Sequence, residues 1–340
     1  MTASLWTAGL EPELDLVFPA CPDNPQMRES VSLWFFEENG RFAAPRMGIE
    51  AEAASWDDRL FQANFAAEGE RVLVGPGKGP VPSAIDAAGR PTIIGAGPVT
   101  FRCIEPFRRW TARFDGTVAD GHVSEQIART LDPQQRVPLT FEIEMEMVVP
   151  AWGQVMGGDS EEAAFMGVGY RFEQLFRAKG TVVLDGESRA ISGTGLRIHR
   201  QSVRQLEGFW GHCWQSAVFP DGRAFGYIAY PPREDGKSTY NEGYIWDGTR
   251  MIAAKIVEAP WLRRIVPQDD DVSFVLESEL GQTRIAGKTR LSTFRVGNPD
   301  MGGLNLQQSG VLYDWDGQQA YGMIERSAHE SLTQIIRDEP

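Results

Sequence analysis

The sequence is poor in the features that mark secreted, zinc-binding and membrane-spanning chains. It contains three cysteines, Cys21, Cys103 and Cys213, without CxxC or Cys/His ligand spacing, which fits a reducing compartment. The first residues have no basic segment and no apolar core of the kind found in secretory signals. No apolar, uncharged stretch approaches the length of a transmembrane helix, about 18 residues. We therefore expect a cytoplasmic protein without a membrane span.

Common cofactor motifs are also missing. No GxGxxG opens a βαβ unit, and neither a Walker A motif nor HExxH or GxSxG occurs. The Gly-rich run at residues 75–79 lacks the spacing of a phosphate loop. These absences argue against nucleotide-binding proteins, zinc proteases and serine hydrolases, and we expect neither a metal ion nor another cofactor.

Basic residues are outnumbered by acidic ones, 33 to 47, and the formal net charge is −14. This balance argues against nucleic acid or an anionic membrane as a partner, because binding to phosphates needs clustered Lys and Arg. With 340 residues the chain exceeds the size at which one core keeps growing, so two domains are expected. Ten Trp and 18 Phe residues supply large rings for a cavity or a core.

Helical periodicity is weak, whereas turn signals recur between short β-prone runs. Asp-Gly and Asn-Gly suit the type I′ turn of a hairpin, because both central residues of that turn need a positive φ. These dipeptides occur at Asn39-Gly40, Asp115-Gly116, Asp120-Gly121, Asp185-Gly186, Asp221-Gly222, Asp235-Gly236, Asp247-Gly248 and Asp316-Gly317. The pattern predicts an all-β protein of two antiparallel barrels or sandwiches.

One strand is predicted with particular clarity at residues 139–148. Apolar residues alternate there with three glutamates, as in a half-buried strand with a solvated acidic face. A metal site made by these glutamates is the less common alternative. The only helical stretch that we expect is the C-terminal tail near residues 329–337. We place the domains at residues 1–188 and 189–340.

The segment Arg171–Arg204, RFEQLFRAKGTVVLDGESRAISGTGLRIHRQSVR, resembles the two-domain lipocalin-like family of carotenoid 1,2-hydratase (hydroxyneurosporene synthase) and AttH-like proteins. That family has an (F/Y)EQ strand, a vDG hairpin and a GxGxRDHSWGxR signature. The closing YDWDGQQAYGMIERS is similar to the last hairpin of the family. The matching positions are Phe172, Glu173, Gln174, Gly180, Asp185, Gly186, Gly193, Gly195, Arg197, His199, Arg204, Asp316, Gly317, Gly322, Glu325 and Ser327.

This resemblance implies two lipocalin-like barrels, a ligand cavity and an apolar small-molecule substrate such as an isoprenoid or a polyketide. Members of the family are hydratases, cyclases or isomerases. The chain departs from the signature at Ile198, Arg200, Gln201 and Ser202, where the family usually has Asp, Ser, Trp and Gly. The missing Asp removes one acid/base group of the family pattern.

Two of the four histidines lie in sequence contexts suited to proton transfer. Strand alternation places His199 on one face with Arg197, and Arg204 follows closely. This group could act as a base beside an anion-binding arginine, or it could form a polar plug between the domains. His212 lies in GFWGHCW, where Trp210 and Trp214 share its face if the segment is extended. That segment could line an apolar pocket or simply pack in a core, and Cys213 would point away from His212.

Further candidates are tyrosines of the next hairpin and three glutamates: Tyr227, Tyr230, Tyr240, Tyr244, Glu173, Glu242 and Glu325. A buried tyrosine could orient a carbonyl, and a cavity carboxyl with a raised pKa could protonate an alkene. Packing of a tyrosine on a neighbouring strand and pairing of a glutamate with arginine are the structural alternatives.

These observations favour a cofactor-independent lyase or isomerase, hydratase-like, that acts on a hydrophobic small molecule at the domain junction. We assign catalysis to His199, His212 and Arg204, and expect both histidines to approach one cavity. We assign substrate binding to Arg197, Trp210, Trp214, Tyr227, Tyr244 and Glu173. A non-catalytic carrier and a glycan-binding β domain remain open as alternative functions. A homodimer is a possible oligomeric state.

Overall fold

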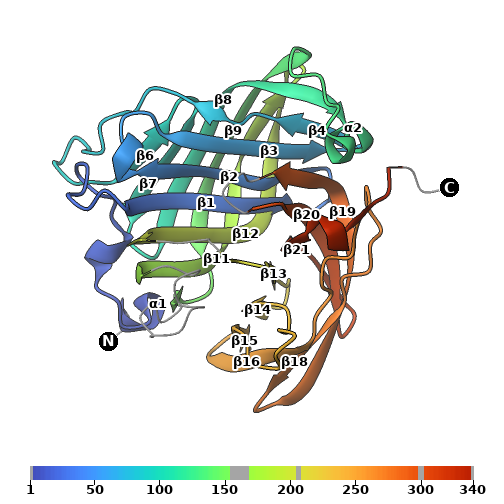
Figure 1. The fold of residues 1–340 in the computed structure, drawn as a ribbon. Coiled ribbons are helices and arrows are strands. Elements are labelled where there is room, and N and C mark those ends of the chain that lie inside the picture. The colour runs from blue at the N-terminus through green and yellow to red at the C-terminus, as the bar shows by residue number, and fades with distance from the viewer. Residues whose placement is uncertain (1–2, 154–167, 204–207, 298–301, 338–340) are drawn as a thin grey trace.

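The computed structural model describes residues 3–153, 168–203, 208–297 and 302–337, and strands dominate this part of the chain (Figure 1). The helices within these ranges are short: α1 (Ala3–Thr7), α2 (Val123–Ala128) and the 3-10 turns Pro12–Asp15, Ala53–Ser55 and Glu330–Leu332. None of them is long and apolar enough to cross a membrane. The all-β prediction is confirmed.

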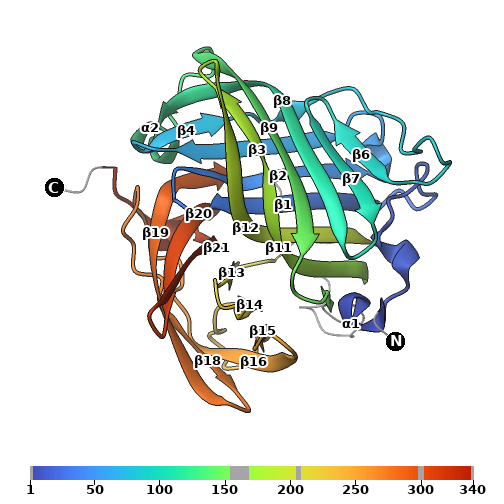
Figure 2. The ribbon, with the colours of Figure 1, turned by 180° about the vertical axis from the view of Figure 1, so that it is seen from behind.

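A first closed barrel contains eight antiparallel strands. They are β1 (Met27–Glu37), β2 (Phe42–Glu52), β3 (Leu60–Ala67), β4 (Arg71–Val74), β8 (Arg109–His122), β9 (Arg136–Met147), β11 (Val168–Leu184) and β12 (Glu187–Val203). Strand β9 pairs with both β8 and β11, which closes the ring. Figure 2 shows the β7–β8–β9 side. Short strands extend the sheet: β5 (Gly77–Lys78), β6 (Ile93–Ala96), β7 (Val99–Glu105) and β10 (Trp152–Gly153).

A second closed barrel follows in the chain. Its strands are β13 (Gly211–Val218), β14 (Ala224–Ala229), β15 (Asn241–Trp246), β16 (Met251–Glu258), β18 (Phe274–Ser278), β19 (Gly281–Gly297), β20 (Leu304–Trp315) and β21 (Gln318–His329). Beside it, β17 (Arg264–Ile265) pairs in parallel with β22 (Gln334–Ile335). Strand pairing passes from the first barrel to the second after Val203, so residues 189–203 belong to the first barrel rather than to the second unit that we expected. Whether the barrels are independent domains stays a prediction.

The Asp-Gly turns form at some of the expected positions. Both residues of Asp185-Gly186 and of Asp316-Gly317 have positive φ, at 55°, 78°, 54° and 79°, between paired strands. Asp115-Gly116 and Asp120-Gly121, however, lie inside the long strand β8, where the first dipeptide pairs with β9 and the second pairs with β4. Ladder hydrogen bonds with a neighbouring strand override the local turn preference there.

Two local predictions have different outcomes. In β9 the apolar residues Phe141, Ile143 and Met145 are buried and the intervening glutamates are exposed, as the alternation predicts. The C-terminal tail forms only one turn of 3-10 helix and then β22, so a longer helix near residues 329–337 is not formed.

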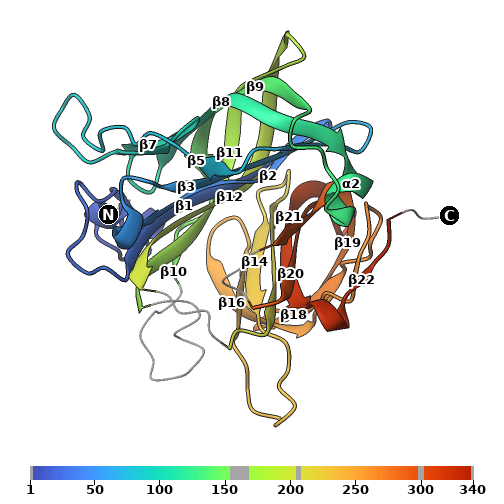
Figure 3. The same ribbon diagram turned by 45° about the horizontal axis from the view of Figure 1, so that its top comes forward.

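Strands β1 and β12 are covered on both faces. Leu33 and Phe35 point into the core of the first barrel, whereas Trp34 and Phe36 point outward into a second apolar cluster that lies between the barrels. Figure 3 shows the two barrels side by side. The interior of the second barrel has its own core, which includes Phe225, Phe274 and Tyr313. The outer faces that meet between the barrels position the site described next.

Candidate active site between the two barrels

A cavity of about 470 Å³ lies between the outer faces of the two barrels. The first barrel contributes side chains from β1, β2, β3, β11 and β12, and the second contributes side chains from β13, β14, β20 and β21. The walls combine aromatic and aliphatic groups with charged ones. Polar side chains therefore converge on an otherwise apolar cavity, as acid/base chemistry on an apolar molecule requires.

His212 reaches the cavity from β13 and is held by two residues of the neighbouring strand β21. Its Nδ1 lies 2.7 Å from Ser327 Oγ, and its backbone N–H donates to the same oxygen at 3.2 Å. Its Nε2 lies 3.4 Å from Glu325 Oε1. Ser327 and Glu325 therefore engage the two ring nitrogens, and the ring itself borders the cavity.

Glu325 is a buried carboxylate with three polar neighbours. Gln308 Nε2 donates to its Oε2 at 2.7 Å, and Arg46 Nη1 lies 3.6 Å from the same oxygen. Burial alone would raise the pKa of Glu325, but the hydrogen bond with His212 and the charge of Arg46 outweigh burial and bring it to about 2. Glu325 is therefore ionised at neutral pH and can stabilise positive charge on His212 or on a substrate.

The aromatic part of the cavity is centred on Trp34 and Trp214. Their ring centroids lie 4.8 Å apart in an edge-to-face arrangement. Trp214 Nε1 donates to Glu173 Oε2 at 3.1 Å, and Arg171 Nη2 lies 2.6 Å from the other oxygen of Glu173. Burial raises the pKa of Glu173, although Arg171 opposes the shift. Glu173 stands behind Trp214 rather than in the cavity wall, so its role here is to position the indole.

His199 does not share this cavity, and our expectation that both histidines line one wall is wrong. It is enclosed at the side of β12 that faces the first barrel, with Nδ1 3.3 Å from Asp15 Oδ1 and Nε2 3.0 Å from Glu29 Oε1. Its neighbours Ile198 and Arg200 line the cavity instead. Alternation along β12 sends consecutive side chains to opposite faces, and β13 belongs to a different barrel.

Arg197 lies with His199, as the strand alternation predicts. It is fully buried, and it donates to Asp15 Oδ1 at 2.7 Å and to Gln174 Oε1 at 2.9 Å. Burial raises the pKa of Asp15, but Arg197 and His199 outweigh it and the pKa is lowered. Burial lowers the pKa of His199, but its hydrogen bonds to the two carboxylates raise it overall. This cluster is a closed ion network and has no contact with the cavity that would let Arg197 bind substrate.

Other predicted site residues lie away from the cavity wall. Trp210 donates its indole N–H to the Pro231 carbonyl at 3.0 Å, and Gly211, with φ of 142°, separates it from His212. Tyr227 is inside the second barrel, where its hydroxyl lies 3.2 Å from Cys213 Sγ. The prediction that Cys213 points away from His212 is confirmed.

The two remaining predicted site residues are Tyr244 and Arg204. Tyr244 packs on Trp152, with ring centroids 5.2 Å apart, and does not line the cavity. Arg204 lies outside the described residues, so its predicted role is untested.

Several residues of the cavity were absent from our sequence-based assignment. Trp34 belongs to the apolar run VSLWFF, and alternation within that run places it opposite Leu33. Arg46 lies 5.4 Å from the Trp34 ring centroid and also reaches Glu325. Alternation along the run VSLWFF could have indicated that Trp34 faces away from Leu33. No pattern in the sequence indicates that Arg46 lies beside Glu325, which is almost 280 positions further along the chain.

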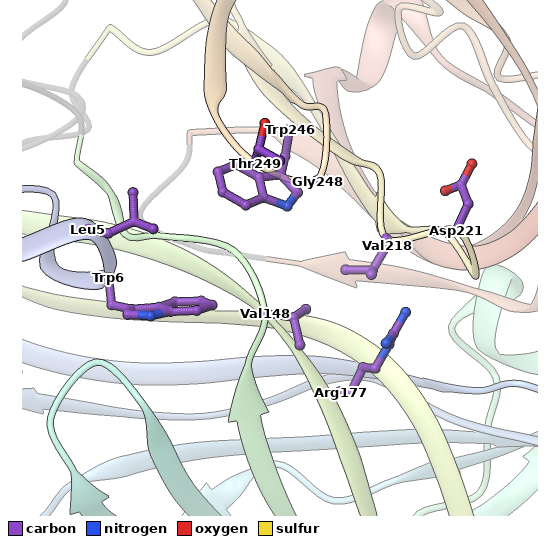
Figure 4. Close-up of a pocket in the computed structure, with 10 residues that line it drawn as sticks. Leu5, Trp6, Val148, Arg177, Val218, Asp221, Trp246, Gly248 and Thr249 are labelled. Atoms are coloured by element: carbon purple, nitrogen blue, oxygen red, sulfur yellow. The ribbon is translucent and has the colours of Figure 1, made fainter. Parts of the chain in front are cut away.

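A second cavity, of about 390 Å³, lies where α1 and the β11 strand face turns of the second barrel (Figure 4). Trp6 and Trp246 lie on opposite sides of it, and Arg177 and Asp221 lie at one end. It contains no histidine, so the cavity around His212 is better equipped for proton transfer. Within the described ranges, no group of three or more His, Cys, Asp or Glu side chains is arranged to hold a metal ion.

Comparison with solved structures shows that this architecture is shared. An AttH-like protein (NE1406) from Nitrosomonas europaea has a TM-score of 0.56 and 15% identity, over 92% of this chain and 98% of that one. CghA has a TM-score of 0.55 and 10% identity, over 90% and 89% of the two chains. Kievitone hydratase from Nectria haematococca has a TM-score of 0.49 and 11% identity, over 93% and 94%. At these identities the first two similarities concern the fold alone, and the shared architecture rests on these two structures.

The fold shared with the first of these neighbours is the fold that the resemblance of the Arg171–Arg204 segment to AttH-like proteins implied. No curated protein matches the chain. One family model does match, and it spans residues 12–330, which includes both barrels and the cavity between them. The chain therefore belongs to the family described as a domain of unknown function, DUF7064.

Proposed function

We propose that this protein is a cofactor-independent lyase or isomerase, hydratase-like, that acts on a hydrophobic small molecule in the cavity between the barrels. The observation that carries the proposal is the pairing of His212 with the ionised Glu325 beside the Trp34–Trp214 pair. A histidine oriented by Ser327 and paired with a carboxylate is a common acid/base arrangement.

In this mechanism the protonated His212 ring donates the Nε2 proton to one carbon of a carbon–carbon double bond. The π electrons form the new C–H bond, and positive charge develops on the other carbon. The faces of Trp34 and Trp214 and the carboxylate of Glu325 stabilise this charge. Attack by water, followed by return of a proton to His212, completes hydration. Loss of a neighbouring C–H proton to His212 instead completes isomerisation.

A second candidate is a non-catalytic carrier of a hydrophobic small molecule. The apolar part of the wall, with Phe209, Ile228 and Leu306, favours this alternative. CghA has also been solved with Sch210972, at a TM-score of 0.50 and 11% identity. A carrier would need no proton exchange at His212.

Incubation of the protein with unsaturated apolar compounds in deuterium oxide separates the two functions. A lyase or isomerase would introduce deuterium at carbon, detected by mass spectrometry, and His212→Gln would reduce the rate about a hundredfold or more. Binding of a compound without deuterium incorporation or product would favour the carrier.

The proposed compartment is the cytoplasm, which the three unpaired cysteines support. A homodimer stays a prediction, and light scattering coupled to size-exclusion chromatography would test it.

A further inference from the structure

The two sides of the cavity around His212 have different chemistry. Arg28, Ser30 and Ser32 occupy alternate positions on β1 and line it, whereas Leu33 and Phe35 on the same strand point into the first core. Arg46, Glu50 and Gln62 continue the polar side on β2 and β3. The opposite side is mainly aromatic and aliphatic. An occupant that suits both sides is amphipathic.

The polar side carries an unusual share of arginine for so acidic a protein. Four arginines and three glutamates line the cavity, without lysine or aspartate, although the whole chain has a net charge of −14. Glu50 lies between two of these arginines, 3.8 Å from Arg28 Nη1 and 3.3 Å from Arg46 Nη2. The carboxylate of Glu50 therefore lies between two guanidinium groups. The second carboxylate near Arg46, that of Glu325, is 3.6 Å from Arg46 Nη1.

Hydrogen-bonding capacity is left over on this side. The Nε atoms of Arg28 and Arg46 are buried and make no hydrogen bond within the described part of the chain, and the same holds for Gln62 Oε1. Buried donors of this kind normally have a partner. The edge of a guanidinium group presents Nε–H and Nη–H in a fork that matches the two oxygens of a carboxylate.

We propose that the molecule bound in this cavity is an amphipathic acid, with an apolar body against Trp34 and Trp214 and a carboxylate that accepts hydrogen bonds from Arg28 and Arg46. The inference rests on the proposed function for the identity of this molecule as the substrate. The ligand class itself follows from the polar side of the cavity and holds for a carried molecule as well.

A pair of fluorescent probes tests the anion preference. Pyrenebutanoic acid and pyrenebutanol share an apolar ring body and differ in the acidic group. We expect the acid to bind on the order of tenfold more tightly at neutral pH and physiological salt, as expected when one charge-assisted hydrogen bond distinguishes the probes. Arg28→Gln should remove most of this preference and leave the affinity for the alcohol unchanged, and Arg28→Lys should retain part of it.

Arg177→Gln is the matched control, because Arg177 lines the cavity of Figure 4 and not the one around His212. Equal binding of the two probes, an equal loss of both in Arg28→Gln, or a preference that disappears in Arg177→Gln would overturn the inference. Circular dichroism of each variant confirms that it is folded. Deuterium incorporation by the wild-type protein decides the proposed reaction separately, so the two proposals can fail independently.

Discussion

The protein contains two buried histidines that each contact a carboxylate, and their surroundings differ in one decisive way. His199 is 1% exposed and has a carboxylate at each ring nitrogen, Asp15 and Glu29, with Arg197 beside them. His212 is 8% exposed, has one carboxylate and one hydroxyl, and faces a cavity of about 470 Å³. A closed network stabilises the fold, whereas an open one can exchange protons with a ligand.

The difference shows that sequence context alone does not tell which histidine reaches a cavity. His199 lies in the family-like segment, yet its partners hold residues 15–18 against the barrel: Asp15 accepts the Phe107 N–H at 2.6 Å and Glu29 accepts the Phe18 N–H at 3.1 Å. His212 lies in an aromatic run without an acidic neighbour in sequence, and its carboxylate comes from a strand more than 100 residues away.

The largest effect on stability is expected when the Asp15 carboxylate is removed from the closed network around His199. Asp15→Ala leaves Arg197 buried without its ion-pair partner, which costs about 3–5 kcal/mol of unfolding free energy. Urea unfolding measures the change. Asp58→Ala removes an exposed partner of Lys78 and should cost less than about 1 kcal/mol. Equal midpoints for the two variants would contradict a stabilising role for the network.

Exchange of each histidine for glutamine should affect turnover at one cluster and unfolding free energy at the other. His212→Gln is expected to lower turnover about a hundredfold or more and to destabilise by about 1 kcal/mol, because Glu325 keeps Gln308 and Arg46 as partners. His199→Gln is expected to destabilise by about 2 kcal/mol, because it leaves buried carboxylates with fewer partners, and to lower turnover only through the folded fraction. If folded His199→Gln turned over as slowly as His212→Gln, the comparison between the clusters would fail.

His199 and Glu325 should also respond to pH with opposite signs. The pKa of Glu325 is lowered from 4.5 to about 2, so its stabilisation is complete above about pH 4.5 and is lost as the pH falls toward 2. The full contribution is at most about 3 kcal/mol. The pKa of His199 is raised above 6.5, so its stabilisation is complete below pH 6.5 and is lost as the pH rises through the folded-state value.

Urea unfolding of the wild type, Glu325→Gln and His199→Gln at acidic, neutral and alkaline pH measures both trends. The stability gap between the wild type and Glu325→Gln should shrink on acidification, and the gap for His199→Gln should shrink on alkalinisation. Gaps that change in the same direction would show that at least one of the two electrostatic environments is assigned incorrectly.

The smallest effect is expected at the hydroxyl that orients His212. Ser327→Ala removes the contact with Nδ1 at 2.7 Å and leaves the His212 N–H without its acceptor, which should cost about 1 kcal/mol. Turnover should fall by up to about tenfold, less than for His212→Gln. Ser327→Thr keeps a hydroxyl and should restore most of the rate. A loss of stability in Ser327→Ala without any change in rate would show that the hydroxyl only holds the strands together.

Much of the fold could be predicted from local patterns. The alternation at Phe141, Ile143 and Met145 specified a half-buried strand, and Asp185-Gly186 and Asp316-Gly317 specified hairpin turns. The same dipeptide at Asp115 and Asp120 failed as a turn signal, because β8 pairs there with β9 and β4, and the dipeptide does not encode this pairing.

The site could be predicted only in part. His212, Trp214 and Glu325 were recognised as candidates, and all three line the cavity. The sequence also indicated that Arg197 and His199 share a face, but not which face, because β12 is buried on both sides and lacks the polar alternation that would distinguish inside from outside.

By itself, then, the amino-acid sequence determined the strand content, several of the hairpins and the parity of side chains along each strand, because these depend on neighbours in the chain. Only the tertiary structure decided that His212 meets Glu325 and Arg46 while His199 meets Asp15 and Glu29. The physical reason is that these pairs come from strands distant in sequence. The ion pair of Arg46 with Glu325 forms where the outer faces of the barrels meet, whereas the pairs of His199 form on the inner side of β12 in the first barrel. In both places burial away from water strengthens the interactions and shifts the pKa values.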